Sequence, residues 1–194
     1  MIYRIHHNEA YLMHSVPPLE AMTKLGEQHG VFAFNAEPKS YVDVWKALHI
    51  DFSPCTGSKT KAVPDISENF GRLFLSAKAH AVLKEVLAEC GEFLPVTYSE
   101  GERGFIFNPL LTVEQLDALD TELTTHDQNG NLEYFSFREE KLKDIAIFKT
   151  QLDTYKGIFC SEEVKKVCET AHLSGITFNP DISNPIGELY TAEQ

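Results

Sequence analysis

The apolar and polar positions along the chain form one pattern that occurs twice. In the first copy, residues 73–75 are a continuous apolar run, Ser76 follows, and an amphipathic stretch leads to Gly91 and a second apolar run. A run with no polar face is typical of a strand covered on both sides. We predict a buried strand, a helix capped by Ser76, a left-handed Gly91 that ends the helix, and a second strand. The buried face of this helix carries Ala79, Val82, Leu83, Val86, Leu87 and Cys90.

The second copy spans residues 158–178, with Ser161 as the predicted cap and Gly175 as the predicted helix stop. Two glutamates follow Ser161 in the first helical turn, where the helix dipole favours negative charge. The buried stripe of this helix carries Val164, Val167, Cys168 and Ala171. Because the serines are explained as caps and the glycines as stops, we interpret both copies as scaffold. The two copies are either a true duplication or two ordinary strand–helix–strand units, which are common, and the predicted architecture is the same in both cases.

The N-terminal third of the chain is less regular. Short apolar runs at residues 2–5 and 31–34 predict two strands. The Pro-Pro pair at residues 17–18 predicts the start of a short helix that ends before Gly26 or Gly30.

Between the two copies, the pattern predicts two hairpins and a helix. A glycine-containing loop lies inside a hairpin over residues 95–107, and the Asn-Gly pair at residues 129–130 is a strong signal for the second hairpin. Thr112 has Gln115 three residues on, as in a capping box, so a short helix is predicted to begin there. A charged turn or helix is predicted at residues 139–143 and a strand at residues 145–148.

These elements predict an α+β fold, with a mixed, largely antiparallel sheet and a few short helices packed on it. The polar, turn-forming residues 53–59 predict an exposed loop and a domain boundary. Residues 1–62 then form an N-terminal β-rich lobe or extension, and residues 63–194 form the main α+β domain. Whether the two parts are separate lobes or one folding unit is left open.

Composition and charge narrow the class of protein. Hydrophobic residues make up 43% of the chain and charged residues 24%, so a packed core is expected. The formal net charge of −12 disfavours nucleic-acid and anionic-membrane partners and favours a basic protein partner, although many soluble proteins are as acidic. The N-terminus lacks the apolar core of a signal peptide, and no stretch approaches the length of a membrane span. We therefore expect a cytoplasmic protein, whose oligomeric state the sequence leaves open.

The sequence holds no motif for catalysis, cofactors or metals. It has no nucleophile elbow, dinucleotide or phosphate-binding glycine motif, and no histidine pair with metal-ligand spacing. The segment from residue 127 partly resembles a calcium loop, but the positions that need glycine and glutamate hold Leu132 and Arg138. We expect no enzyme, no catalytic residue, no cofactor and no metal site.

One charge feature is more specific, because residues 104–137 contain no lysine or arginine. The acids of this segment are Glu114, Asp117, Asp120, Glu122, Asp127 and Glu133. An uncompensated acidic patch costs stability and therefore predicts a surface for a basic partner. The alternative is a solvated face whose charge is balanced by bases elsewhere, such as Lys141 and Lys143.

The second part of the chain resembles the bacterial immunity proteins found with polymorphic toxins, in immunity protein family eleven, formerly a domain of unknown function. The resemblance covers roughly residues 63–180. It rests on the order and spacing of the segments at residues 73–76, 92–96, 147–149, 158–161 and 173–178. It implies a cytoplasmic protein, made beside a toxin gene, that binds and blocks the cognate toxin domain. It implies no catalytic residues and does not identify the toxin.

Two other classes stay open from the sequence alone. One is a small enzyme with dispersed active-site residues, which a deep pocket lined by a carboxylate or histidine with a shifted pKa would support. The other is a binding module that acts without a toxin, which the neighbouring reading frame would distinguish from an immunity protein.

Overall fold

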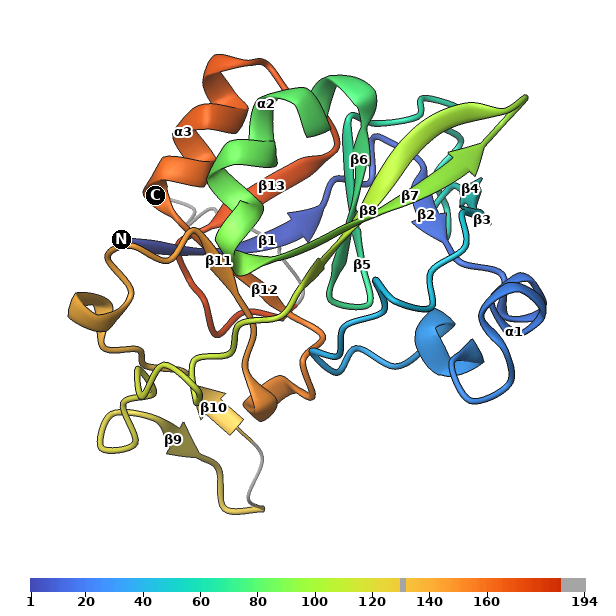
Figure 1. Cartoon of the computed structure of the whole chain (residues 1–194). Coiled ribbons are helices and arrows are strands. Elements are labelled where there is room, and N and C mark those ends of the chain that lie inside the picture. Colours follow the sequence, from blue (N-terminus) through green and yellow to red (C-terminus); the bar gives the residue numbers. More distant parts are fainter. Residues whose placement is uncertain (130–131, 186–194) are drawn as a thin grey trace.

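The computed structural model describes residues 1–129 and 132–185 (Figure 1). The α+β prediction is confirmed: three α-helices accompany several sheets, which are mostly antiparallel. The helices are α1 (Pro18–Leu25), α2 (Ala77–Leu87) and α3 (Glu162–Thr170). Short 3-10 turns are η1 (Gly30–Ala33), η2 (Ala88–Cys90), η3 (Glu139–Lys141) and η4 (Gln151–Asp153). No helix in the described part of the chain is long and apolar enough to cross a membrane.

The larger sheet has five strands in the order β3-β7-β8-β6-β5, of which only the β3–β7 pair is parallel. Its strands are β3 (Leu48–His49), β5 (Ile66–Asn69), β6 (Arg72–Ser76), β7 (Gly91–Tyr98) and β8 (Glu102–Pro109). The hairpin predicted at residues 95–107 is confirmed as β7–β8.

A second, antiparallel sheet has the order β11-β12-β1-β13. Its strands are β1 (Ile2–His7), β11 (Ile147–Phe148), β12 (Ile158–Ser161) and β13 (Ile176–Asn179). Two small sheets pair β2 (Met13–Ser15) with β4 (Asp51–Ser53), and β9 (Thr125–His126) with β10 (Leu132–Tyr134). The β9–β10 pair confirms the second hairpin; position 130 of its predicted Asn-Gly tip at residues 129–130 lies outside the described residues.

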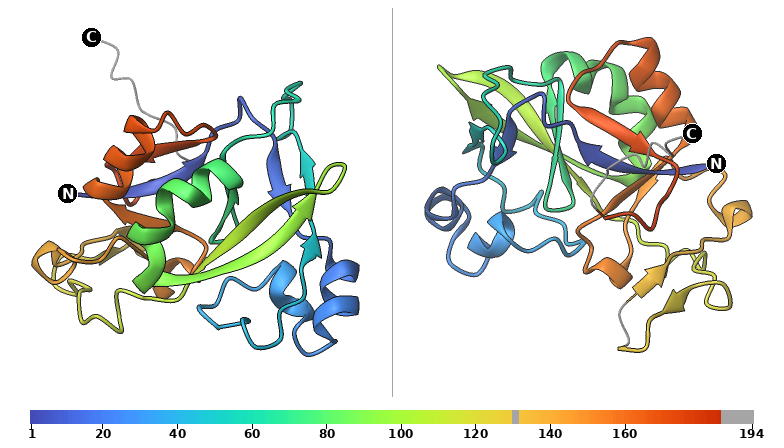
Figure 2. Two further views of the ribbon diagram at one scale, coloured as in Figure 1. Left: turned by 45° about the horizontal axis from the view of Figure 1, so that its top comes forward. Right: turned by 180° about the vertical axis from the view of Figure 1, so that it is seen from behind.

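Both copies of the repeated pattern form a β–α–β unit with a gap one strand wide. In the first unit, β8 lies between β6 and β7 and is antiparallel to both. In the second, β1 lies in the same way between β12 and β13. The two helices, α2 and α3, contact each other and lie side by side, in green and orange-red in Figure 2. The predicted strand–helix–strand order is therefore confirmed in both copies.

One apolar core joins the two units, and each sheet has a second core on its other face. In the shared core, Leu83 of α2 and Val164 of α3 pack with side chains from both sheets. Residues 21–50 cover the other face of the five-stranded sheet, against Phe74 of β6. Residues 113–142 cover the other face of the four-stranded sheet, against Phe159 of β12. Strands covered on both sides explain the continuous apolar runs that opened each copy.

The helix ends depart from the prediction in two places. Ser76 caps α2 as predicted, because its Oγ accepts a hydrogen bond from the Ala79 N–H at 3.1 Å. Ser161 was predicted to cap α3, but its side chain makes no capping hydrogen bond and its Oγ is buried without a partner among the described residues. Gly91 is extended, with φ of 175°, so the predicted left-handed stop is wrong there. A side chain at Gly91 would collide with the carbonyl oxygen of Asn108 on the paired strand.

Two further local predictions are wrong for identifiable reasons. Residues 31–34 were predicted as a strand, but they lie in and just after η1, where Phe32 is 1% exposed and packs edge-on to Tyr41 and Trp45. The capping box is formed, since Thr112 and Gln115 exchange hydrogen bonds at 3.1 and 3.2 Å, but only turns follow it. Asp117 has a φ of 50°, and a left-handed residue there ends the helical geometry after one turn.

Other elements agree with the sequence. α1 begins at Pro18 and ends at Leu25, before Gly26, a charged 3-10 turn occupies Glu139–Lys141, and β11 lies within residues 145–148. The domain division at residue 62 stays a prediction, with the added observation that β1 pairs with strands from the far end of the chain.

Candidate functional site

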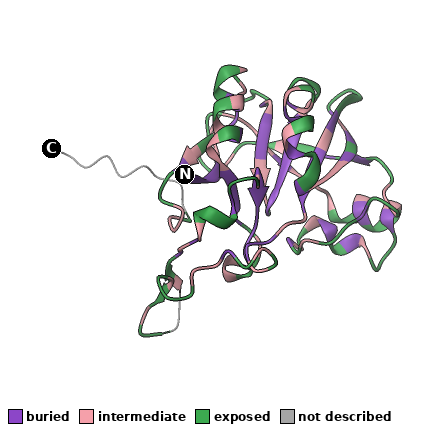
Figure 3. Cartoon of the chain, turned by 60° about the vertical axis from the view of Figure 1, so that its left-hand side comes forward, coloured by how far each residue is buried: buried purple, intermediate pink, exposed green. Residues whose placement is uncertain are grey.

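The acidic segment covers one sheet with apolar residues and exposes three of its six acids. Val113, Ala118, Phe135 and Phe137 belong to the core on the four-stranded sheet. The segment continues into the β9–β10 hairpin, which extends from the body and is mostly exposed (Figures 1 and 3). This arrangement explains why a segment rich in acids still has a fixed path, since these apolar side chains are buried while every one of its acids is at least partly exposed.

Two of the six acids hold the local structure together. One oxygen of the half-buried Glu114 accepts hydrogen bonds from the Thr150 hydroxyl at 2.6 Å and the Gln151 N–H at 2.8 Å. Asp120 accepts from the N–H groups of Glu122 and Leu123, both at 3.1 Å, and so closes the turn before β9. These carboxylates therefore stabilise the segment and the neighbouring η4.

A third acid, Asp117, is exposed but paired. Its carboxylate forms an ion pair with Lys141, and this hydrogen-bonded contact lowers the pKa of Asp117 below its usual value. The pair supports the alternative of local charge balance for this one residue. Exposed pairs of this kind contribute little to stability.

The remaining acids, Glu122, Asp127 and Glu133, lie on or beside the hairpin. Glu122 and Glu133 are exposed, and Asp127 is half-buried and accepts a hydrogen bond from the Asn129 N–H at 2.8 Å. Asp127 and Glu133 line the same open hollow of about 460 Å³. The structure thus brings two of the six predicted residues to one hollow and assigns local structural contacts to Glu114, Asp117 and Asp120.

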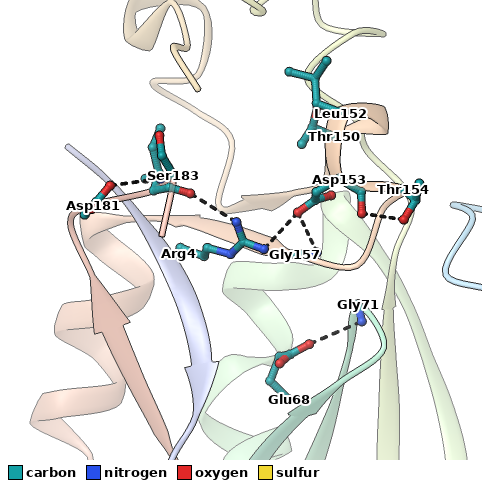
Figure 4. A network of polar contacts seen from close by, with 11 residues as sticks. Arg4, Glu68, Gly71, Thr150, Leu152, Asp153, Thr154, Gly157, Asp181 and Ser183 are labelled. Carbon is teal, nitrogen blue, oxygen red and sulfur yellow. Dashed lines mark hydrogen bonds and ion pairs between the residues drawn. The ribbon is translucent and has the colours of Figure 1, made fainter. Parts of the chain in front are cut away.

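A second polar site, which the sequence reasoning missed, lies beside β1 (Figure 4). Arg4, at the centre of β1, is 7% exposed, and its guanidinium pairs with the Asp153 carboxylate at 3.1 Å. The same carboxylate oxygen accepts from the Gly157 N–H at 2.9 Å, while Arg4 also donates to the Ile182 carbonyl at 3.3 Å. Glu68 of β5 lies nearby and accepts from the Gly71 N–H at 3.3 Å.

Burial dominates the electrostatics of this network. It raises the pKa of Glu68 from 4.5 to about 7, although nearby Arg4 and Lys149 favour the ionised form. Burial also raises the pKa of Asp153, with Arg4 opposing that effect. The pKa of Lys149 is well below its usual value, mainly because its side chain is buried. Such groups are costly to bury and are tolerated because they are paired and hydrogen-bonded.

An open hollow of about 400 Å³ borders the network, lined in part by Arg4, His6, Glu68 and Asp153. Burial and the nearby Arg4 lower the pKa of His6 to about 4, so its imidazole is neutral near pH 7. The described residues that line this hollow include no serine, threonine or cysteine nucleophile. The arrangement suits a structural ionic network between β1, β5 and the loop after η4. A signal was present in the sequence, because Arg4 interrupts an apolar run that must be buried.

No set of three or more histidine, cysteine, aspartate or glutamate side chains within residues 1–129 and 132–185 is placed to hold a metal ion. The cysteines Cys90, Cys160 and Cys168 are buried, and Cys55 is half-buried. Burial raises the pKa values of Cys160 and Cys168 above the usual value, to about 12 for Cys168, so these thiols stay protonated.

The fold and these surfaces define an α+β protein with an acidic projecting hairpin and a separate buried ionic network beside β1. The chain belongs to an immunity protein family, Imm11, whose family model matches residues 2–181. The match confirms the resemblance and extends it over the N-terminal third, where the sequence reasoning found none. The curated proteins compared with the chain give no match. Family membership implies, in general terms, the neutralisation of a toxin.

Proposed function

We propose that this protein is the cytoplasmic immunity partner of a toxin domain encoded beside it and that it neutralises that toxin by direct contact. The family match over residues 2–181 is the observation that carries this proposal. The net charge of −12 supports a basic toxin, such as a nuclease, because complementary fields raise association rates and deter wrong partners. The protein acts here as an inhibitor and not as an enzyme.

Within this proposal, the acidic segment contributes to the toxin-facing surface. Glu122, Asp127 and Glu133 supply charge from the projecting hairpin, where a partner has access from several sides. Glu114, Asp117 and Asp120 act mainly by holding the segment in shape, through the contacts to Thr150, Lys141 and the turn before β9.

Co-expression with the C-terminal domain of the adjacent reading frame tests the function itself. We expect the wild-type protein to restore growth of cells that make the toxin domain and to co-purify with it. Growth inhibition that persists at full expression of folded protein, with no complex, would overturn the proposal.

Charge reversal tests the surface. Changing Glu122, Asp127 and Glu133 together to lysine should weaken toxin binding about tenfold or more at low salt, with a smaller loss at high salt. A matched triple reversal uses Glu85, Glu89 and Glu163, which are exposed on α2, η2 and α3. If the two triple variants had equal affinities and equal salt dependence, the β9–β10 hairpin would not be part of the toxin interface.

One observation favours the enzyme alternative, namely the hollow lined by Glu68, whose pKa is about 7. A carboxyl with that pKa suits proton transfer near neutral pH. The variant Glu68→Gln separates the alternatives because it keeps the shape of the side chain. Protection by direct contact survives this change, whereas protection through general acid–base chemistry at Glu68 is lost.

A further inference from the structure

Two buried basic side chains fix the backbone of η1 and of the residues that follow it. Arg72 of β6 is 3% exposed and donates to the carbonyl oxygens of Phe32 at 3.0 Å and Asn35 at 2.7 Å. Lys149 is 0% exposed and donates to the carbonyl oxygen of Ala36 at 2.9 Å. The Arg72 guanidinium also lies 4.0 Å from the ring centroid of Phe32. Residues 32–36 are therefore held from inside the protein at three carbonyl groups.

This fixed segment presents an aromatic side chain to solvent. Phe34 is 56% exposed, and together with Tyr155 it lines an open hollow of about 440 Å³. Phe70, which is 44% exposed, lines the neighbouring hollow beside Arg4. Exposed aromatic side chains on a rigid backbone lose little entropy on binding, which is why they are common anchors of protein interfaces.

The backbone around these aromatic residues is strained. Phe70, Thr154 and Tyr155 have φ values of 49°, 58° and 63°, in the left-handed region that non-glycine residues rarely adopt. The glycine at position 71 is required, because a side chain there would collide with the carbonyl oxygen of Tyr155. Strained backbone of this kind clusters at functional sites.

One basic side chain lies between the two hollows, while Glu37 lines the hollow beside Phe34 and Glu68 and Asp153 line the other. Lys156 lines both hollows, and its ammonium group makes no hydrogen bond or ion pair with any described residue. In a chain with a net charge of −12, an exposed lysine without an acidic partner between two aromatic-lined hollows is complementary to a carboxylate.

We propose that Phe34, Phe70, Tyr155 and Lys156, the aromatic surface, form the central contact for the toxin domain. The toxin segment that binds there carries an apolar side chain, which enters the hollow lined by Phe34 and Tyr155, and an adjacent carboxylate, which pairs with Lys156. This inference rests on the proposed function and adds an apolar centre to an interface whose acidic rim is the β9–β10 hairpin.

The two parts of this interface are physically connected. Gln151 of η4 lines the hollow beside Phe34, and its N–H is held by Glu114 of the acidic segment. Figures 1 and 2 show η4 and the β9–β10 hairpin at the same end of the molecule. A partner seated on the aromatic surface is therefore in reach of the acidic hairpin.

The test measures binding of an inactivated C-terminal domain of the adjacent reading frame to purified variants. Phe34→Ala should weaken binding about thirtyfold or more, as expected for a central aromatic contact. Lys156→Gln should weaken binding about tenfold and Lys156→Glu about a hundredfold, because the last change places two negative charges together. The matched controls are Val63→Ala and Lys61→Glu, at exposed positions in the loop between β4 and β5, and should bind within about twofold of wild type.

The outcomes separate this inference from the function on which it rests. If the wild type binds the toxin domain tightly and both Phe34→Ala and Lys156→Glu match the controls, the aromatic surface does not contact the toxin. The proposed immunity function is unaffected by that result. If the wild type neither binds nor protects, the proposed function fails and the surface fails with it. Thermal melting midpoints near that of the wild type confirm that any loss of binding is not a loss of folding.

Discussion

The units β6–α2–β7 and β12–α3–β13 have the same order of elements and the same gap between their strands, but the gap is filled from different places. In the first unit, β8 follows β7 through a tight turn at residues 99–101 and folds back into position. In the second, the filling strand is β1, from the opposite end of the chain. The first unit is therefore completed by a strand that follows it directly in the chain. The second is completed by a strand from the opposite end of the chain.

This difference matters for folding because closing a long loop costs more entropy than closing a hairpin. Every strand contact that closes the first unit lies within residues 72–109. The second also needs β1 from the opposite end of the chain, and residues 2–6 of β1 are all buried. The two sheets also differ in what covers the face away from the shared core. Residues 21–50 cover the five-stranded sheet, and residues 113–142 cover the four-stranded sheet.

Removal of β1 should cause the largest loss of stability among the changes that distinguish the two units. Deletion of residues 1–7 takes away the ladder partner of both β12 and β13 and the buried side chains of Tyr3 and Ile5. Each large buried side chain contributes about 2–5 kcal/mol, against a typical total of about 5–15 kcal/mol. We expect the shortened protein to lose its cooperative urea transition and its near-ultraviolet circular dichroism.

Matched single substitutions provide the control for that deletion. Ile5→Ala in β1 and Ile106→Ala in β8 each remove part of one fully buried side chain, at 2% and 0% exposure, and should leave a folded protein. A deletion variant that still unfolds cooperatively would show that the second unit does not depend on β1.

A stability effect of intermediate size is expected at β5, where the two units meet. Glu68 lies on β5, which contacts β1 and β13. Because its pKa is raised from 4.5 to about 7, the folded protein binds a proton between these values that the unfolded chain does not. The free energy of unfolding therefore falls as pH rises through this window. Glu68→Gln removes the cost of the buried charge and should stabilise the protein by about 1–3 kcal/mol at pH 8 and little at pH 4.5.

Urea unfolding of wild type and Glu68→Gln at the two pH values measures this effect. Asp153→Asn is the contrasting variant, because Asp153 pairs with Arg4 and its loss leaves a buried cation unpaired. We expect Asp153→Asn to destabilise the protein at pH 8. A Glu68→Gln effect that does not change with pH would contradict the raised pKa.

The smallest expected difference in stability between the two units lies at the N-termini of α2 and α3. Ser76→Ala removes the cap on the Ala79 N–H and a hydrogen bond to Asp65, and should cost about 1–2 kcal/mol. Ser161→Ala removes a buried hydroxyl that has no partner among the described residues, so its effect should lie within about 0.5 kcal/mol of zero or be stabilising. Equal losses in the two variants, measured by thermal unfolding, would mean that Ser161 also caps its helix.

Local patterns predicted the elements whose signals are short in sequence. Apolar periodicity located α2 and α3, the capping box at Thr112 formed as expected, and the turn residues located both hairpins. The same reasoning failed at residues 31–34 and at Gly91, where the deciding contacts come from elsewhere in the chain. An apolar run is compatible with a strand or a 3-10 turn, and its neighbours select between them.

The candidate site also combines features set by the local sequence with features set by distant contacts. The sequence by itself determined the acidic character of residues 104–137, since charge requires no structure, and it determined the strand–helix–strand order of both units. Only the tertiary structure decided which acids face a partner, because Glu114 bonds to Thr150 and Asp117 to Lys141 across distant segments. Only the tertiary structure placed β1 between β12 and β13 and Phe34 beside Tyr155, because contacts between the ends of a chain leave no local pattern.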